Sequence, residues 1–221
     1  MELSEQEQVR RQSLQTMRDM GINPYPADEY AVTGYSKDIK EGFKDDDTTA
    51  EWYTGKEVRI AGRLMSKRIM GKASFIELQD SKGRIQVYVS RDDIQAPVPE
   101  GGTATTVEQQ MYNVVFKKLL DIGDFIGIEG YVFRTQMGEI SVHAKKLTVL
   151  AKSLRPLPIV KYKDGVAYDG FNDPEQRYRQ RYVDLIVNDG VKDVFLKRAT
   201  IIRTMRRVFD EAGYTEVETP I

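Results

Sequence analysis

Residues Ala61–Tyr88, AGRLMSKRIMGKASFIELQDSKGRIQVY, decide the fold. Apolar and polar residues alternate on both sides of the turn signal Asp80–Gly83, which predicts two antiparallel strands. A two-residue loop within this turn would set Phe75 opposite Tyr88 on one face of the hairpin. The other face would bury four aliphatic side chains: Ile76, Leu78, Ile85 and Val87.

The outer face of this hairpin combines rings, an amide and cations. Glu77 would lie opposite Gln86, and the preceding segment brings Arg63 and Arg68 before any carboxylate. Rings stack bases, an amide hydrogen-bonds to a base edge and cations contact phosphates, so this face suits single-stranded nucleic acid. A half-solvated hairpin with an incidental exposed Phe75 fits the same spacing, and the pattern alone leaves both interpretations open.

Charge is plentiful in the 221-residue chain but balanced, because 33 Lys and Arg against 34 Asp and Glu give a net charge of -1. Any nucleic-acid site must therefore be a local patch. The absence of cysteine excludes disulfides and cysteine zinc sites, and a single histidine, His143, excludes a multi-histidine metal centre. With neither a signal-peptide segment nor a run of membrane-spanning length, we expect a cytoplasmic protein that does not enter a membrane.

The segments around the hairpin predict a barrel. A strand begins at Val58 and bends near Gly62, and the hairpin supplies the next two strands. Residues 97–106 predict a surface loop and Gln109–Leu120 an amphipathic helix, before two further strands. Candidate inward residues are Met111, Val115, Leu119, Leu120, Ile126, Ile128, Val132, Ile140 and Val142. Three strands, a helix and two strands over roughly ninety residues are typical of the OB-fold, a five-stranded Greek-key barrel that binds oligonucleotides.

Residues 1–54 are predicted to form an N-terminal helical extension. Ser4–Glu7 match a capping box, and the helix would run to Met20 and stop at Gly21. Its apolar positions are sparse, so we expect it to dock loosely. The acidic run Asp45–Asp47 fits a solvated linker better than a magnesium site.

Glu139 is the outward-facing carboxylate of the last predicted barrel strand. A uracil edge offers one N–H donor between two carbonyl acceptors, so a carboxylate can take the donor while an amide or guanidinium serves a carbonyl. Glu139 with Gln86 or Arg68 is therefore a candidate uracil reader, although a solvated residue beside a turn is the commoner fate of such a glutamate. His143 fits a surface or cross-strand residue better than a catalyst.

Residues 151–180 are predicted as a linker after a barrel domain at 55–150. Each proline in Leu154–Pro158 restricts the residue before it, which favours an extended connector. Glu175–Tyr182 carries three arginines at alternate positions, whose charge spreads around a helix or forms one basic edge of an extended chain.

The last segment, 181–221, has the strongest helix pattern. A broad apolar stripe runs over Val194–Ala212, Gly213 ends it, and a strand is expected over 214–221. A long helix and one strand have nothing here to close over them. We interpret this segment as the start of a second α+β domain whose remainder is absent.

Together these motifs resemble, in order, those of bacterial class II lysyl-tRNA synthetases. The matching runs are GRLMSKRIMGKASFIELQD, GRIQVYV, GEISVH, LRPLP, RYRQRYVDL and GYTEVETP. The resemblance covers the chain from residue 56 onward, apart from Ile94–Tyr112, which is longer than usual. Related aspartyl and asparaginyl enzymes share the layout, but MGKASF and LRPLP are closer to the lysyl branch.

In that family the barrel binds the anticodon. The resemblance implies that Phe75 stacks an anticodon base, that Gln86 and Glu139 read the central uridine and that Arg68 contacts nucleotides or backbone. Arg63 is a further RNA-binding candidate.

The helix that ends at Gly213, with the following Pro220, resembles class II motif 1. In the family this element builds the homodimer interface, and its proline reaches toward the partner's active site. Ordinary core packing is the other role of the apolar stripe, and we expect burial within the subunit and burial at the dimer interface both to contribute.

The resemblance further implies an enzyme that activates L-lysine with ATP and Mg2+ and transfers it to tRNA(Lys). Its motifs 2 and 3 and the lysine pocket would lie beyond Ile221, so no catalytic residue, metal ligand or cofactor is assigned within the chain. We expect these residues to bind tRNA without catalysis. The two alternatives are a non-enzymatic OB-fold binder of single strands and the N-terminal part of an aspartyl or asparaginyl relative.

Overall fold

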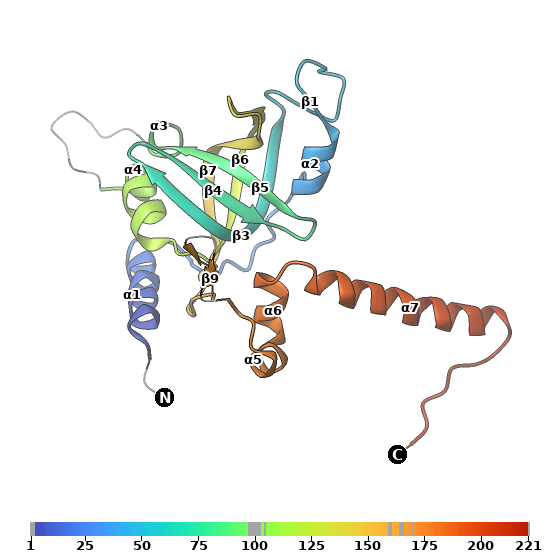
Figure 1. Cartoon of the computed structure of the whole chain (residues 1–221). Coiled ribbons are helices and arrows are strands. Elements are labelled where there is room, and N and C mark those ends of the chain that lie inside the picture. The colour runs from blue at the N-terminus through green and yellow to red at the C-terminus, as the bar shows by residue number, and fades with distance from the viewer. Residues whose placement is uncertain are drawn as a thin grey trace. The chain divides into compact units, whose positions relative to one another are not determined.

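The alternating segments of the sequence pair into one closed barrel (Figure 1). Its strands follow the order β3-β4-β5-β7-β6. Their bounds are Glu57–Met70 for β3, Ala73–Gln79 for β4, Arg84–Ser90 for β5, Phe125–Arg134 for β6 and Ile140–Ala151 for β7. Neighbouring strands are antiparallel except β5 and β7, whose parallel pairing closes the barrel. The five-stranded barrel expected from the sequence is confirmed.

The computed structural model describes residues 3–96, 103, 105–158, 161–163, 166–168 and 170–220. Most of the loop expected at 97–106 lies outside these residues. The chain divides into two units, Met1–Pro156 and Leu157–Ile221. The barrel and its helices belong to the first unit, which carries the candidate site.

The β4–β5 hairpin has the predicted register. Phe75 lies opposite Tyr88 and Glu77 opposite Gln86, and the Asp80 amide donates to the Gly83 carbonyl over 2.9 Å. All four predicted core residues of the hairpin are at most 2% exposed: Ile76, Leu78, Ile85 and Val87. Period-two alternation and a two-residue loop therefore determine which side chains of the hairpin face outward.

Strand β3 shifts its register against β4 between Leu64 and Ser66, shortly after the expected bend at Gly62. A Cβ atom on Gly62 would lie 2.7 Å from the Gln79 carbonyl oxygen. The two strands approach so closely at this point that a side chain would force them apart.

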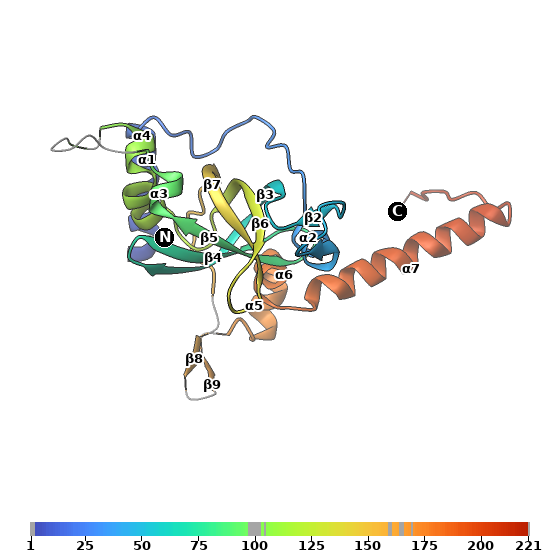
Figure 2. The same ribbon diagram turned by 90° about the horizontal axis from the view of Figure 1, so that it is seen from above.

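Helices cover the two ends of the barrel (Figures 1 and 2). Their bounds are α1 Glu5–Asp19, α2 Ser36–Gly42, α3 Arg91–Ile94, α4 Val107–Gln110 and the π-helix η1 Met111–Leu119. Two short parallel strands, β1 Phe43–Lys44 and β2 Trp52–Tyr53, follow α2. Helix α1 packs against η1 at one end, whereas α2 lies at the other end near the β4–β5 turn.

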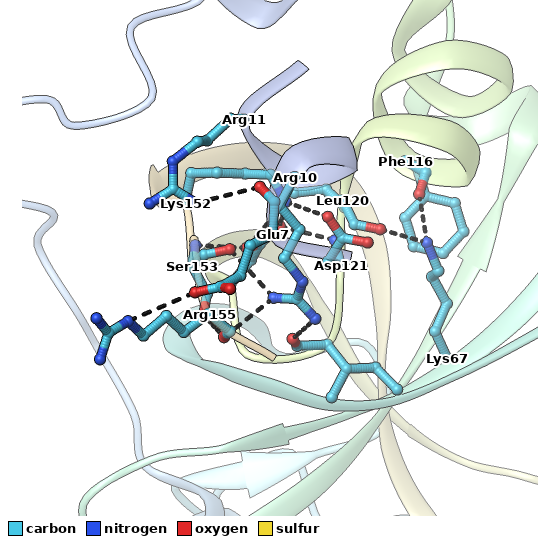
Figure 3. Close-up of polar contacts among 12 residues, drawn as sticks. Glu7, Arg10, Arg11, Lys67, Phe116, Leu120, Asp121, Lys152, Ser153 and Arg155 are labelled. Carbon is cyan, nitrogen blue, oxygen red and sulfur yellow. Dashed lines mark hydrogen bonds and ion pairs between the residues drawn. The ribbon is translucent and has the colours of Figure 1, made fainter. Parts of the chain in front are cut away.

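Helix α1 begins at the predicted capping box of Ser4 and Glu7, but the expectation that it docks loosely is wrong. Met17 is fully buried, and the Arg10 side chain is buried as well. The Arg10 guanidinium donates to the carbonyl oxygens of Ser153 at 3.1 Å and Ile122 at 3.0 Å (Figure 3). Arg10 thus holds the helix against the barrel through backbone acceptors. The number of apolar residues in the helix gives no indication of these polar contacts.

The helix expected at Gln109–Leu120 is present as α4 and η1. Val115, Leu119 and Leu120 are buried as predicted, and Met111 is partly buried. The largest buried side chains of this segment are instead Tyr112 and Phe116, whose rings stack with centroids 5.3 Å apart.

A buried ion cluster lies where the chain leaves the barrel (Figure 3). The side chains of Lys152 and Asp124 are both 0% exposed, and Lys152 Nζ lies 2.9 Å from Asp124 Oδ2 and 2.5 Å from Asp121 Oδ2. The Ser153 amide also donates to Asp124 at 2.7 Å. Because every charge in the cluster has a partner of opposite sign, its desolvation is offset within the cluster.

The described residues of the second unit form a short antiparallel pair of strands and three helices. Their bounds are β8 Lys161–Lys163, β9 Val166–Tyr168, α5 Pro174–Arg179, α6 Arg181–Val187 and α7 Val191–Glu211. The arginine-rich segment is therefore helical, and α7 confirms the strongest helix pattern of the sequence. Residues 214–220 do not form the expected strand, because no described strand pairs with them.

Replacing Lys152 by methionine should lower the free energy of unfolding by about 3–5 kcal/mol, because the buried Asp124 would lose its partner and would have to stay charged or take up a proton. Urea unfolding at neutral pH measures this loss. Lys146→Met is the matched control: Lys146 pairs with Glu129 at 3.1 Å, but its side chain is 67% exposed. The Lys146→Met variant should lose no more than about 1 kcal/mol in free energy of unfolding. Equal losses for the two variants would contradict the role given to the buried Lys152–Asp124 pair.

The effect of Lys152→Met should also depend on pH. Burial raises the pKa of the Asp124 carboxyl, and the Lys152 charge opposes that rise. Without Lys152 the folded state would hold a proton that the unfolded state releases above pH about 4. The variant should therefore lose stability relative to the wild type as the pH rises from about 4 to 7. A difference that stays constant over this range would contradict the prediction.

Candidate nucleic-acid interface

The outer face of the barrel carries a concavity of about 690 Å³. Four of the five RNA-binding candidates line it: Arg68, Phe75, Gln86 and Glu139. The other lining residues are Lys40, Ser66, Ile76, Glu77, Thr135 and Met137. The side chains that the sequence suggested for base stacking, edge recognition and phosphate contact thus surround one space.

Strand pairing sets Arg68, Phe75, Tyr88 and His143 in one row across four strands. The Phe75 and Tyr88 rings lie 5.3 Å apart at 58°, and Tyr88 meets His143 at 4.9 Å. Neighbouring rings restrict the rotamers of Phe75, so its ring is held in place before any ligand arrives. A preset ring stacks a base with little loss of side-chain entropy.

Gln86 and Glu139 come together because β5 pairs with β7, which sets Gln86 opposite Ser141. Gln86 Nε2 donates to Ser141 Oγ at 3.0 Å, and Ser141 Oγ donates to the Glu139 carbonyl at 3.3 Å. Thr135 fixes the turn before β7, because its Oγ1 accepts from the Glu139 amide at 3.0 Å. The strand pair therefore orients the Gln86 amide, and the turn fixes the backbone from which the Glu139 side chain extends.

Charges in the concavity are unevenly paired. Glu77 lies 3.3 Å from Arg84, and Glu139 lies 2.8 Å from Lys40 of α2. Within the described part of the chain, the Arg68 guanidinium has neither a hydrogen-bond nor an ion-pair partner. Arg68 is thus a cation available to a phosphate group.

Arg63, the fifth candidate, does not line the concavity. Its guanidinium donates to the Gly123 carbonyl at 2.9 Å and lies 4.2 Å from the centroid of the Phe125 ring. Burial lowers the pKa of Arg63. The structure therefore separates Arg63 from the other four candidates and engages it within the barrel.

Lys40, Thr135 and Met137 also line the concavity but are not among the residues predicted from the sequence. Met137 is 95% exposed at the tip of the turn before Glu139, so its nearness to Glu139 could have been a local signal. Lys40 lies 99 positions before Glu139 and has no such signal.

His143 is a cross-strand residue, as the sequence favoured. Its Nδ1 lies 2.8 Å from the Tyr131 hydroxyl, and its Nε2 lies 2.8 Å from Asp93 Oδ2. Burial raises the pKa of Asp93, but hydrogen bonds from Lys145 and His143 outweigh it and hold the pKa below its ordinary value. The imidazole is thus bonded on both sides and joins β7 to α3.

In the second unit Gly213 follows α7 with φ +85°, a conformation that glycine adopts without strain. Pro220 lies in the non-strand segment after it, and Glu216 of that segment pairs with Arg206 at 3.0 Å. Most large apolar side chains of α7 are exposed: Val194, Phe195, Leu196, Ile201, Ile202, Met205, Val208 and Phe209.

Among the described residues, acidic and histidine side chains form no cluster of three that could hold a metal ion. No helix in this part of the chain combines the length and the apolar character needed to cross a membrane.

Comparisons with known proteins match both units. Residues 58–150 match the family described as OB-fold nucleic acid binding domain, and residues 173–221 match tRNA synthetases class II (D, K and N). The chain is 58% identical over 221 residues to the lysine–tRNA ligase of Porphyromonas gingivalis and 58% over 219 residues to that of Azobacteroides pseudotrichonymphae. All or 99% of this chain is aligned, but it spans only 36% and 41% of those relatives' lengths.

Replacing Asp80 by alanine should release α2 from the barrel. The Asp80 carboxylate accepts from the Ser36 amide at 2.6 Å, from Ser36 Oγ at 2.7 Å and from two amides of its own turn. We expect a loss of about 1–3 kcal/mol in urea unfolding and faster amide exchange in α2. Asp46→Ala, at an exposed position, is the control and should change stability by less than about 0.5 kcal/mol. Unchanged exchange in α2 would contradict the anchoring role.

Proposed function

We propose that this chain belongs to the lysine–tRNA ligase family of class II synthetases and that its barrel binds the anticodon loop of tRNA(Lys). The observation that carries the proposal is the single concavity that brings together a ring, an amide, a carboxylate and an unpaired guanidinium. An anticodon loop presents unstacked bases and phosphates to all four kinds of group.

Each group has a defined task in the proposal. Phe75, held by Tyr88, stacks the central base of the anticodon. Glu139 accepts the N3–H of uridine, and Gln86 serves a neighbouring carbonyl. Arg68 contacts a phosphate, because its guanidinium is unpaired among the described residues.

For the whole protein we propose the activity that the names of the relatives state, ligation of lysine to its tRNA. L-lysine, ATP and Mg2+ would be the further ligands, and their motifs are not among these 221 residues. These residues alone are therefore proposed to bind tRNA without catalysis. We further propose that the protein is cytoplasmic. We also propose four segments: an N-terminal helical extension at 1–54, the anticodon-binding barrel at 55–150, a linker at 151–180 and the start of the catalytic domain at 181–221.

The exposed apolar side of α7 is proposed as a homodimer surface. Its large apolar side chains are exposed in this chain, and a partner subunit that covered them would remove them from water, which favours association. Gly213 and Pro220 follow this helix and are proposed to direct the chain toward the partner subunit. Neither a non-enzymatic OB-fold binder of single strands nor an aspartyl or asparaginyl relative is favoured, because the identity to lysine–tRNA ligases extends over all of the chain.

Binding of an anticodon stem-loop with a central uridine tests the site. Phe75→Ala should weaken binding by about 1–3 kcal/mol through lost stacking. Gln86→Ala and Glu139→Ala should reduce the preference for uridine over cytidine by about 1–3 kcal/mol. Tyr178→Ala removes an exposed ring of α5, outside the barrel, and serves as the control. Equal affinity of the three site variants and the wild type would refute the assignment.

The salt dependence of binding tests Arg68 separately. Each phosphate contact contributes roughly one to the slope of log affinity against log salt, so Arg68→Ala should reduce the slope by about one. The same measurement on Arg63→Ala tests the fifth candidate, whose guanidinium donates a hydrogen bond to the Gly123 carbonyl. We expect a smaller change in slope for Arg63, and a slope for Arg68→Ala equal to the wild type would contradict its role.

A further inference from the structure

Helix α2 places a cation at the concavity that the sequence did not indicate. The helix is fixed to the barrel by the fully buried Ile39 and by the two hydrogen bonds between Ser36 and Asp80. The next residue after Ile39, Lys40, therefore lines the concavity from a fixed backbone. Its position is determined by the fold and not by a free loop.

Lys40 contacts one carboxylate oxygen of Glu139, the residue proposed to accept the N3–H of uridine. Its Nζ lies 2.8 Å from Glu139 Oε1, while Glu139 Oε2 has no partner within the described part of the chain. The two side chains are 38% and 48% exposed, so water screens the pair and its contribution to stability is small. Stabilisation of the fold therefore does not explain why Lys40 and Glu139 are paired.

The concavity gives this pair a role in recognition. A carboxylate that faces RNA is repelled by the neighbouring phosphates, and only Arg68 among the nearby cations lacks a partner in the described residues. A cation on Oε1 offsets this repulsion and fixes the plane of the carboxylate. Oε2 is then left to accept the N3–H of a base.

We propose that Lys40 is a positioning residue that sets Glu139 for the selection of uridine over cytidine, an inference that rests on the proposed function. Cytidine presents an acceptor at N3, so a correctly oriented carboxylate oxygen rejects it. Without Lys40 the carboxylate turns more freely and faces the phosphates unscreened. The loss should therefore fall on uridine-containing loops more than on cytidine-containing ones.

The experiment measures dissociation constants of the full 221-residue chain for two stem-loops that differ only in a central uridine or cytidine. Lys40→Ala should lower the uridine-to-cytidine preference roughly tenfold, and Lys40→Arg should restore most of it. In a Glu139→Gln background, Lys40→Ala should change the preference by less than about twofold, because the two residues act as one unit. Lys37→Ala is the matched control, since Lys37 belongs to the same helix but pairs with Glu41 outside the concavity.

An unchanged preference in Lys40→Ala would overturn the inference. An equal loss for both loops, or the same loss in the Glu139→Gln background, would overturn it as well, because Lys40 would then be a simple phosphate contact. Phe75→Ala separates this failure from that of the proposed function. If Phe75→Ala weakens binding and Lys40→Ala does not alter the preference, only the role of Lys40 is lost.

Discussion

The parallel pairing of β5 with β7 closes the barrel, and it sets Gln86 opposite Ser141. This pairing joins two parts of the chain that are separated by β6 and the helices α3, α4 and η1. Through it the hairpin that carries Phe75 meets the turn that carries Glu139. A shift by one residue would turn Gln86 into the core and remove it from the concavity. The geometry of the site is therefore a consequence of closure, and the chemistry of any single strand would not produce it.

A second constraint acts where the chain leaves the barrel. Lys152 and Asp124 are fully buried as a pair, and Arg10 donates to the backbone of Ser153 and Ile122 beside it. A buried pair is costly to form, but it has one favourable geometry, so it specifies the path of the backbone more than it stabilises the fold. Helix α1 and the exit segment are thus held in one register with the barrel.

Sequence reasoning was accurate where the controlling interactions are local. The register of the hairpin follows from period-two alternation and a two-residue loop. These two features are sufficient to predict that Phe75 lies opposite Tyr88. It failed where partners are distant: the loose docking expected for α1 overlooked Arg10, whose acceptors lie more than a hundred positions away. Arg63 was also a candidate for RNA binding, because the sequence shows its charge but not its partner. In the structure its guanidinium donates to the Gly123 carbonyl.

The distribution of pairing within the concavity explains how a chain of net charge -1 can present a site for a polyanion. Glu77 and Glu139 are each matched by a cation, so neither projects an unscreened negative charge toward the ligand. Arg68 then supplies a positive charge that has no partner among the described residues, and the proposed function assigns this charge to a phosphate. The proposed function in this way assigns affinity and selectivity to different groups, because a paired carboxylate can discriminate between base edges without repelling the backbone that carries them.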